Sequence, residues 1–254
     1  MTKLDSYRTI TMFDVPVKAV TMDEVMSMVN DAIVTRESLD IGVVNVAKIV
    51  NMKRNPELRD AVLNSDVIFA DGAGVVLASK LLGEPLPCRI AGIDLMWEMY
   101  KASNTKKYRV FCFGATEEIN TKVADIIHEE FPDLLLVGRR NGYYDENEEE
   151  RIANEIAATK PDILLVAMTS PKKEKFMANW SVTMNVPVVH GVGGSFDVMA
   201  GKVKRAPELW QKFGMEWLYR VKQEPGRLWK RYLITNSLFF SMLIKAMFKK
   251  ILSR

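Results

Sequence analysis

Short apolar runs alternate with segments of helical periodicity along most of this chain. Six of the runs have the length of buried strands: Ile41–Val44, Val67–Ala70, Val110–Gly114, Leu134–Val137, Ile163–Ala167 and Val186–His190. Between them, residues 116–130 and 148–158 carry apolar side chains at helical spacing. Strands that alternate with helices require crossover connections, so the pattern predicts an α/β fold with a Rossmann-like, mainly parallel sheet and helices on both faces.

The predicted helices have recognisable starts. Thr116 and Ser170 are placed to cap the helices that follow them, and Pro171 occupies the first helical position after Ser170. Asn147 is a suitable N-cap for residues 148–158, whose acidic first turn suits the positive end of the helix dipole.

The pattern changes after residue 198. Residues 208–223 predict one aromatic-rich helix, Pro225-Gly226 breaks it, and residues 227–251 predict another helix with a broad apolar face. The uninterrupted apolar stretch of that last helix is shorter than the ~20 residues that cross a bilayer. We therefore expect an α/β core, residues 1–198, and a helical appendage, residues 199–254.

Charge divides the chain at the same point. The 254 residues carry a net charge of +3, but residues 199–254 hold 13 Lys and Arg against 3 Asp and Glu, a net of +10, which leaves −7 for residues 1–198. This asymmetry indicates an anionic partner for the appendage. Because its cations flank an apolar face, we expect the last helix to lie in a membrane interface; the alternative is a core helix packed on the body.

Composition excludes several classes of protein. Hydrophobic residues make up 48% of the chain, which allows a full core and excludes a disordered or fibrous protein. Cys88, Cys112, His128 and His190 are too few for a disulfide framework or a cysteine zinc site, and they leave little room for a histidine metal site or a Ser-His-Asp triad. We expect Cys112 to be buried and inert and His128 to lie on a helix surface. The first residues lack the apolar region of a signal peptide.

Glycines and polar residues follow nearly every predicted strand. They are Asn45, Asp71–Gly74, Gly114–Thr116, Gly138 with Asn141–Tyr144, Thr169–Glu174 and Gly191–Asp197. The carboxyl ends of parallel strands meet at one edge of a sheet, where ligands bind. The sequence therefore predicts one continuous crevice, and it leaves open whether His190, at the end of a strand, faces this crevice or the core.

Asp71 is the strongest candidate for chemistry in the crevice. A carboxylate after a buried strand can act as a general base, although Asp-Gly is also a common turn pair. Neither glycine-rich stretch completes a dinucleotide fingerprint, because Leu77 and Phe196 stand where the last glycine belongs, but their backbone amides can still hold a diphosphate. The chain has no D-x-D pair, so a metal-dependent mechanism loses support.

Several motifs together resemble one family. The motifs are Asn45, Ala70–Val76, Arg89–Leu95, Phe113–Ala115, Asn141–Tyr144, Ser170–Glu174, Gly191–Asp197, Gly201 with Lys204–Pro207, and Glu216–Arg220. In this order and spacing, from about Phe13 to Tyr232, they resemble the WecG/TagA/CpsF glycosyltransferases. Each motif alone is weak, whereas the ordered set is specific.

The resemblance implies an inverting transfer of a sugar from a UDP-sugar to an undecaprenyl-diphosphate-linked sugar, in teichoic acid, common antigen, capsule or exopolysaccharide synthesis. The sugar would be N-acetylmannosamine, its uronic acid or a related hexose. The resemblance also implies a Rossmann-like core and an appendage that completes the site, attached peripherally to the cytoplasmic face of the bacterial plasma membrane. The family is understood to need no metal, so the UDP-sugar would be a substrate and no cofactor is expected. Whether the chain forms a homo-oligomer is open.

By the same resemblance, Asp71 is the catalytic base. The expected substrate-binding residues are Asn45, Gly72, Arg89, Gly114, Tyr143, Lys173, Glu174, Gly193, Gly194, Asp197, Arg205, Arg220 and Arg227. Backbone amides and the arginines would neutralise the leaving diphosphate, unless the arginines contact only solvent or lipid phosphate. Tyr143 would stack on the uracil and Asp197 would bind the ribose; the alternatives are loop packing for Tyr143 and a helix N-cap for Asp197.

The chain departs from the family at two positions. Val43 stands where the family often has threonine, so a hydroxyl role is absent there. Lys173 stands where the family usually has glutamine. Its charge would lie near a diphosphate or an acidic sugar, or its side chain would point to solvent.

A rival interpretation is a non-catalytic protein that binds a nucleotide or an anionic polymer through its basic appendage. Nucleic-acid sites rely on phosphate contacts and stacking aromatics, whereas these cations accompany a broad apolar face. We therefore expect an anionic membrane surface as the partner of the appendage, and no nucleic acid.

Overall fold

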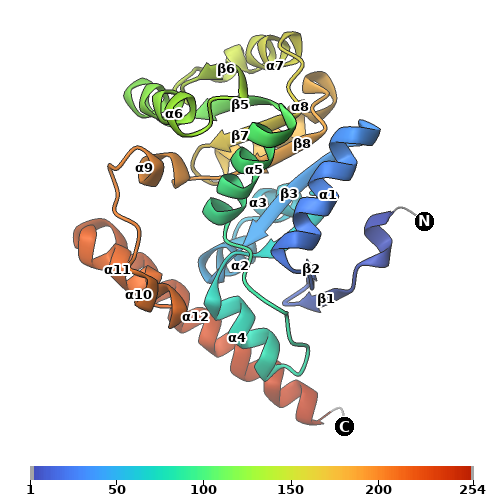
Figure 1. Ribbon diagram of the computed structural model, residues 1–254. Coiled ribbons are helices and arrows are strands. Elements are labelled where there is room, and N and C mark those ends of the chain that lie inside the picture. The colour runs from blue at the N-terminus through green and yellow to red at the C-terminus, as the bar shows by residue number, and fades with distance from the viewer. Residues whose placement is uncertain (1–2, 253–254) are drawn as a thin grey trace.

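Within residues 3–252, which the computed structural model describes, a six-stranded parallel sheet forms the centre of the molecule (Figure 1). The strands lie in the order β4-β3-β8-β7-β5-β6, and each neighbouring pair is parallel. Their bounds are β3 Leu39–Val44, β4 Val67–Ala70, β5 Arg109–Gly114, β6 Leu135–Arg140, β7 Ile163–Ala167 and β8 Val188–Gly191. The predicted α/β class is confirmed, and each of the six predicted runs forms a strand.

Helices cover both faces of this sheet. One face packs against α1 (Met22–Thr35), α5 (Gly92–Lys106) and α6 (Glu117–Glu130). The other packs against α2 (Val46–Met52), α3 (Pro56–Leu63), α7 (Glu149–Ala158) and α8 (Lys172–Met184). Successive residues of β7 enter opposite cores, so its continuous apolar run reflects burial on two faces.

Four further elements lie at the edge of the core, and the sequence analysis assigned none of them. An antiparallel hairpin of β1 (Thr9–Met12) and β2 (Val15–Lys18) precedes α1. Helix α4 (Ala73–Leu81) begins directly after the Asp-Gly turn that follows β4. A short 3-10 helix, η1, spans Lys3–Ser6.

The predicted helix starts are partly confirmed. Thr116 caps α6, because its hydroxyl accepts a hydrogen bond from the Ile119 backbone N–H at 3.3 Å. The prediction of Asn147 as an N-cap is wrong. Asp145 and Glu148 instead form a capping box around a short 3-10 helix, η2 (Glu146–Glu148), which leads into α7.

Two other predicted boundaries are also wrong. Ser170 does not cap α8, since the helix begins at Lys172 after Pro171 without a side-chain cap. Strand β6 continues to Arg140 because a bulge opposite Phe111 brings Gly138 into register. A Cβ atom on Gly138 would lie 2.5 Å from the Phe111 ring, so glycine lets the strand pass beneath that ring.

The appendage follows α9 (Ser195–Met199) and contains α10 (Glu208–Lys212), α11 (Glu216–Gln223) and α12 (Pro225–Leu252). The single helix predicted for residues 208–223 is therefore wrong. Gly214 separates α10 from α11 with a φ of 70°, and a Cβ atom there would lie 2.5 Å from Cβ of Ala73 in the core. This close approach requires glycine, so contact with the core sets the break. Pro225 begins α12, a position that suits proline.

One face of α12 packs on the core. Phe239 and Leu243 are buried with Ile49 of α2 and Ala78 of α4, and the Phe239 ring meets the Phe13 ring with centroids 5.1 Å apart. The core-helix alternative thus holds for this face. Another face is apolar and exposed, with Trp229, Leu233, Phe240, Phe248 and Leu252. No helix in the described part of the chain is long and apolar enough to cross a membrane.

Candidate active site

The predicted crevice residues follow the carboxyl ends of the strands, and they form two groups along that edge. Asn45 follows β3, Asp71 follows β4 and Gly193-Gly194 follow β8, and these three strands are neighbours in the sheet. Gly114 ends β5 and Tyr143 follows β6, toward the opposite side of the sheet. The carboxylate and the exposed tyrosine therefore mark the two ends of the candidate site.

Asp71 is held where β4 meets α5. Its Oδ1 accepts a hydrogen bond from the Gly92 backbone N–H at 3.1 Å. Gly92 is the first residue of α5, so the carboxylate lies at the positive end of a helix. Burial raises the Asp71 pKa above its ordinary value, although the Gly92 amide and the cations Arg220, Arg89 and Lys48 oppose the rise. A carboxyl group poised in this way is suited to accept a proton.

Lys48 of α2 and Glu174 and Lys173 of α8 form a buried network, and its two lysines interact electrostatically with Asp71. Lys48 Nζ lies 2.9 Å from Glu174 Oε1, and Lys173 Nζ lies 3.5 Å from the same oxygen. Lys173 Nζ also donates a hydrogen bond to the Gly191 carbonyl at 3.3 Å. The alternative that Lys173 points to solvent is wrong, because its side chain is only 8% exposed.

Burial and charge set the protonation of this network. Burial and the nearby Lys48 lower the pKa of Lys173 to about 8. Burial alone would raise the pKa of Glu174, but Lys48 and Lys173 outweigh it and lower that pKa to about 2. At neutral pH Lys173 is therefore a cation and Glu174 a carboxylate.

Lys48 is a residue that the sequence analysis missed. Asn45 caps α2, and its Oδ1 accepts a hydrogen bond from the Lys48 backbone N–H at 3.0 Å. A lysine in the first turn after a capping residue at a strand end was the available signal. The sequence alone does not show that α8 brings Glu174 against this lysine.

His190 does not face the crevice. Its side chain is fully buried, and Nε2 lies 3.2 Å from the Gly92 carbonyl oxygen. Burial lowers the His190 pKa to about 4, so the ring is neutral at neutral pH. Its contact supports the same backbone residue that holds Asp71.

Ion pairs attach the appendage to the core beside Asp71. Arg89 pairs with Glu216 of α11, and one of its terminal nitrogens also lies 3.8 Å from an Asp94 oxygen. Arg205, which follows α9, pairs with Asp94 as well. The structure thus brings two predicted arginines to one carboxylate, that of Asp94.

The remaining two predicted arginines lie farther along the appendage. Arg220 is on α11 and lowers the Asp71 pKa, so it lies within electrostatic range of that carboxyl. The side chain of Arg227 lies outside the described residues.

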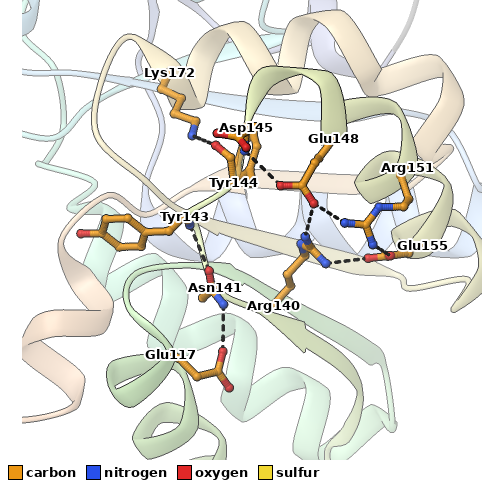
Figure 2. A network of polar contacts seen from close by, with 10 residues as sticks. All are labelled: Glu117, Arg140, Asn141, Tyr143, Tyr144, Asp145, Glu148, Arg151, Glu155 and Lys172. Atoms are coloured by element: carbon orange, nitrogen blue, oxygen red, sulfur yellow. Dashed lines mark hydrogen bonds and ion pairs between the residues drawn. The ribbon is translucent and has the colours of Figure 1, made fainter.

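Tyr143 lies on the loop from β6 to η2, which hydrogen bonds of Asn141 hold in place (Figure 2). Asn141 accepts a hydrogen bond from the Tyr143 backbone N–H at 3.1 Å and donates one to Glu117 at 3.0 Å. The Tyr144 ring packs against Phe113 and Phe176, and the Lys172 ammonium lies 3.5 Å from its centroid. The loop-packing alternative for Tyr143 is wrong, because its side chain is 75% exposed and its ring points away from the network.

Asp197 and the remaining glycines line the strand ends. Asp197 lies inside α9, whose N-cap is Gly194, so the N-cap alternative for Asp197 is wrong; its carboxylate lies 3.3 Å from Lys202 Nζ. Gly72 is the N-cap of α4. Gly114 has a φ of 125°, and a Cβ atom there would lie 2.3 Å from the Ala167 carbonyl oxygen, so only glycine fits between β5 and β7.

Other candidate groups lie away from this chemistry. Cys112 is buried and its pKa is raised to about 12 by burial, which confirms an inert thiol. His128 is exposed on α6, as predicted. Across residues 3–252, no group of three or more His, Cys, Asp and Glu side chains is placed to hold a metal ion.

Comparison with known proteins gives consistent matches. The profile of the glycosyl transferase WecG/TagA/CpsF family matches residues 10–252. A Bacillus spizizenii protein named N-acetylglucosaminyldiphosphoundecaprenol N-acetyl-beta-D-mannosaminyltransferase is 38% identical over 180 residues, which cover 71% of this chain and 69% of that protein. A Bacillus subtilis protein of the same name is 38% identical over 174 residues, 68% of this chain and 67% of that protein.

Proposed function

Because the chain belongs to the WecG/TagA/CpsF family of glycosyl transferases, we propose that it transfers an N-acetylmannosamine-type sugar from UDP to an N-acetylglucosaminyl-diphospho-undecaprenol acceptor. The names of the two Bacillus proteins support the acceptor and the sugar. The observation that carries the proposal is Asp71, a partly buried carboxylate with a raised pKa at a sheet edge surrounded by cations.

Asp71 acts as the base in this mechanism. Its carboxylate takes the proton of the acceptor hydroxyl, and the hydroxyl oxygen forms a bond to the anomeric carbon on the face opposite UDP. The bond from that carbon to the diphosphate oxygen breaks, and its electron pair leaves with UDP. The configuration of the anomeric carbon is therefore inverted.

The leaving diphosphate needs positive charge. Arg89 and Arg220 act near Asp71, and Arg205 joins Arg89 at Asp94. Fixed cations and backbone amides of this kind stabilise the charge that develops on a leaving group. We propose that they do so here without a metal ion, and that the appendage completes the site because Arg205 and Arg220 belong to it.

In this proposal the Tyr143 ring stacks on the uracil, and the Asp197 carboxylate binds the ribose. Changing Tyr143 to alanine should raise the KM for the UDP-sugar by about 10-fold and leave kcat nearly unchanged, because base stacking contributes about 1–3 kcal/mol. Steady-state kinetics with varied donor measures this. Tyr143→Phe keeps the ring and serves as the matched control, and an unchanged KM in Tyr143→Ala would exclude the stacking role.

The appendage is proposed to bind the membrane that holds the lipid-linked acceptor, at the cytoplasmic face of the bacterial plasma membrane. Helices α4, α10, α11 and α12 lie together at one end of the molecule (Figure 1). Exposed apolar side chains lie on these helices and on the turn after α10: Leu77, Leu81, Leu209, Phe213, Trp217, Leu218, Trp229, Leu233, Phe240 and Phe248. Exposed cations on the appendage accompany them: Lys212, Lys222, Lys230, Arg231, Lys245 and Lys249. An apolar surface with basic residues suits an anionic lipid interface.

A donor screen tests the proposed function. The full chain is incubated with a soluble N-acetylglucosaminyl-diphosphate lipid analogue and one UDP-sugar at a time, and release of UDP is measured. We expect acceptor-dependent release with UDP-N-acetylmannosamine, its uronic acid or a related UDP-hexose. Absence of release with every donor, from a chain that retains its appendage, would contradict the proposal.

A further inference from the structure

Two cations of the core share a single carboxylate oxygen beside the candidate base. Lys48 comes from α2 and Lys173 from α8, and both lie within 3.5 Å of Glu174 Oε1. The side chains of all three residues are at most 11% exposed. A buried charge keeps its influence because little water screens it.

The charges that face Asp71 come from several elements. Arg220 of α11 and Arg89, which precedes α5, act on it from the appendage side, and Lys48 of α2 and Lys173 of α8 act on it from the core. Glu174 opposes the two lysines. The Gly92 amide adds the positive end of α5, and His190 behind it is neutral.

The lysines differ from the arginines in what else they must do. Arg89 is paired with Glu216, and the arginines are the groups proposed to meet the diphosphate. When substrate is bound, the positive charge of these arginines would therefore also be neutralised by the diphosphate.

The Asp71 backbone N–H donates a hydrogen bond to the Val44 carbonyl at 2.9 Å, and the next residue, Asn45, caps the helix whose first turn carries Lys48. The fold therefore places Lys48 beside Asp71. Because Glu174 holds the Lys48 ammonium inside the core, that charge stays near Asp71 when substrate binds.

We propose that Lys48 is a positioning residue that keeps the Asp71 carboxyl anionic, and that Glu174 anchors Lys48 while offsetting part of its charge. This inference rests on the proposed role of Asp71 as the base. It assigns Glu174 a role in the charge balance of the base rather than in direct contact with substrate.

Removing the charge of Lys48 and removing the charge of Glu174 should shift the pKa of Asp71 in opposite directions. Lys48→Met removes a cation, so the pKa of Asp71 rises and the acid limb of the pH profile of kcat/KM moves to higher pH, by about one unit. Glu174→Gln removes an anion, so the positive charge of the two lysines is no longer offset. The acid limb then moves to lower pH by a similar amount. A residue with a purely structural role would reduce activity in both variants without moving the limb.

The test compares pH profiles of kcat/KM for the wild type, Lys48→Met, Glu174→Gln and Lys48→Arg. Lys48→Arg keeps the charge and should retain the wild-type limb. Lys175→Met is the matched control on α8, since Lys175 pairs with Glu57 at the surface. Thermal unfolding confirms that each variant folds.

Infrared titration of the carboxyl band supplies a readout that does not need activity. The difference between each protein and its Asp71→Asn counterpart reports the protonation of Asp71 alone. Shifts in opposite directions for Lys48→Met and Glu174→Gln support the inference even if no sugar transfer is detected, in which case only the proposed function fails. Shifts in the same direction, or an unmoved Asp71 band in both folded variants, would overturn it.

Discussion

Changing Asp71 to asparagine is expected to lower turnover by about 10³-fold, the middle of the range that a positioned general base contributes. Asparagine has the same shape as aspartate, and its Oδ1 can still accept the hydrogen bond from Gly92. It cannot take the proton of the acceptor hydroxyl. Acceptor-dependent UDP release at saturating donor measures the loss. Asp125→Asn, at an exposed position on α6, is the matched control and should keep wild-type turnover.

The same variant has an expected signature in stability. The pKa of Asp71 is raised in the folded protein, so the wild type loses stability as pH rises from the unfolded value through the folded one. Asparagine has no proton to lose. We therefore expect Asp71→Asn to unfold at a higher temperature than the wild type at pH 7, with the difference vanishing as the pH falls below about 4. Near-normal turnover in a folded variant would exclude Asp71 as the base.

Changing Trp229, Phe240 and Phe248 together to serine should lower the affinity of the chain for anionic vesicles by at least about 100-fold. Burying a large apolar side chain contributes roughly 1.5–3 kcal/mol, and these three are half or more exposed on α12. The packing of α12 on the core should survive, because Phe239 and Leu243 make it. Sedimentation with phosphatidylglycerol vesicles measures the partition.

A control for this prediction uses exposed apolar residues elsewhere. Val34→Ser with Val182→Ser removes two exposed side chains from α1 and α8, and it should bind vesicles as the wild type does. Equal vesicle binding by the triple variant would contradict the membrane role of α12. Salt-sensitive binding of DNA or RNA by the wild type, without vesicle binding, would favour the rival anionic-polymer interpretation.

The sheet was predictable because its strands are buried on both faces. Continuous apolar runs such as Ile163–Ala167 stand out from the chain, and β7 has those same bounds. Helices with one buried stripe give a weaker signal, and α1, α4 and α5 were not assigned. The break between α10 and α11 depends on the contact of Gly214 with Ala73, more than a hundred residues away in the chain, which no local pattern reports.

The site was predictable where a residue type is unusual for its position. Asp71 stood out because it follows a buried strand, whereas Tyr143 entered the candidate site through the family resemblance. The burial of Lys173 was not predictable, since a lysine in the first turn of a helix is usually solvated. The fold brings the Gly191 carbonyl at the end of β8 to Lys173, and it brings Glu174 of α8 to Lys48 from a distant part of the chain.

The anomeric configuration of the product tests the proposed chemistry most directly. Proton NMR of the reaction between a UDP-α-linked donor and the acceptor analogue, recorded in EDTA as product first forms, reports that configuration. Direct attack by a hydroxyl that Asp71 deprotonates gives a β-linked product without added metal. An α-linked product would contradict this mechanism, because retention requires a second displacement at the anomeric carbon or attack from the face that UDP leaves.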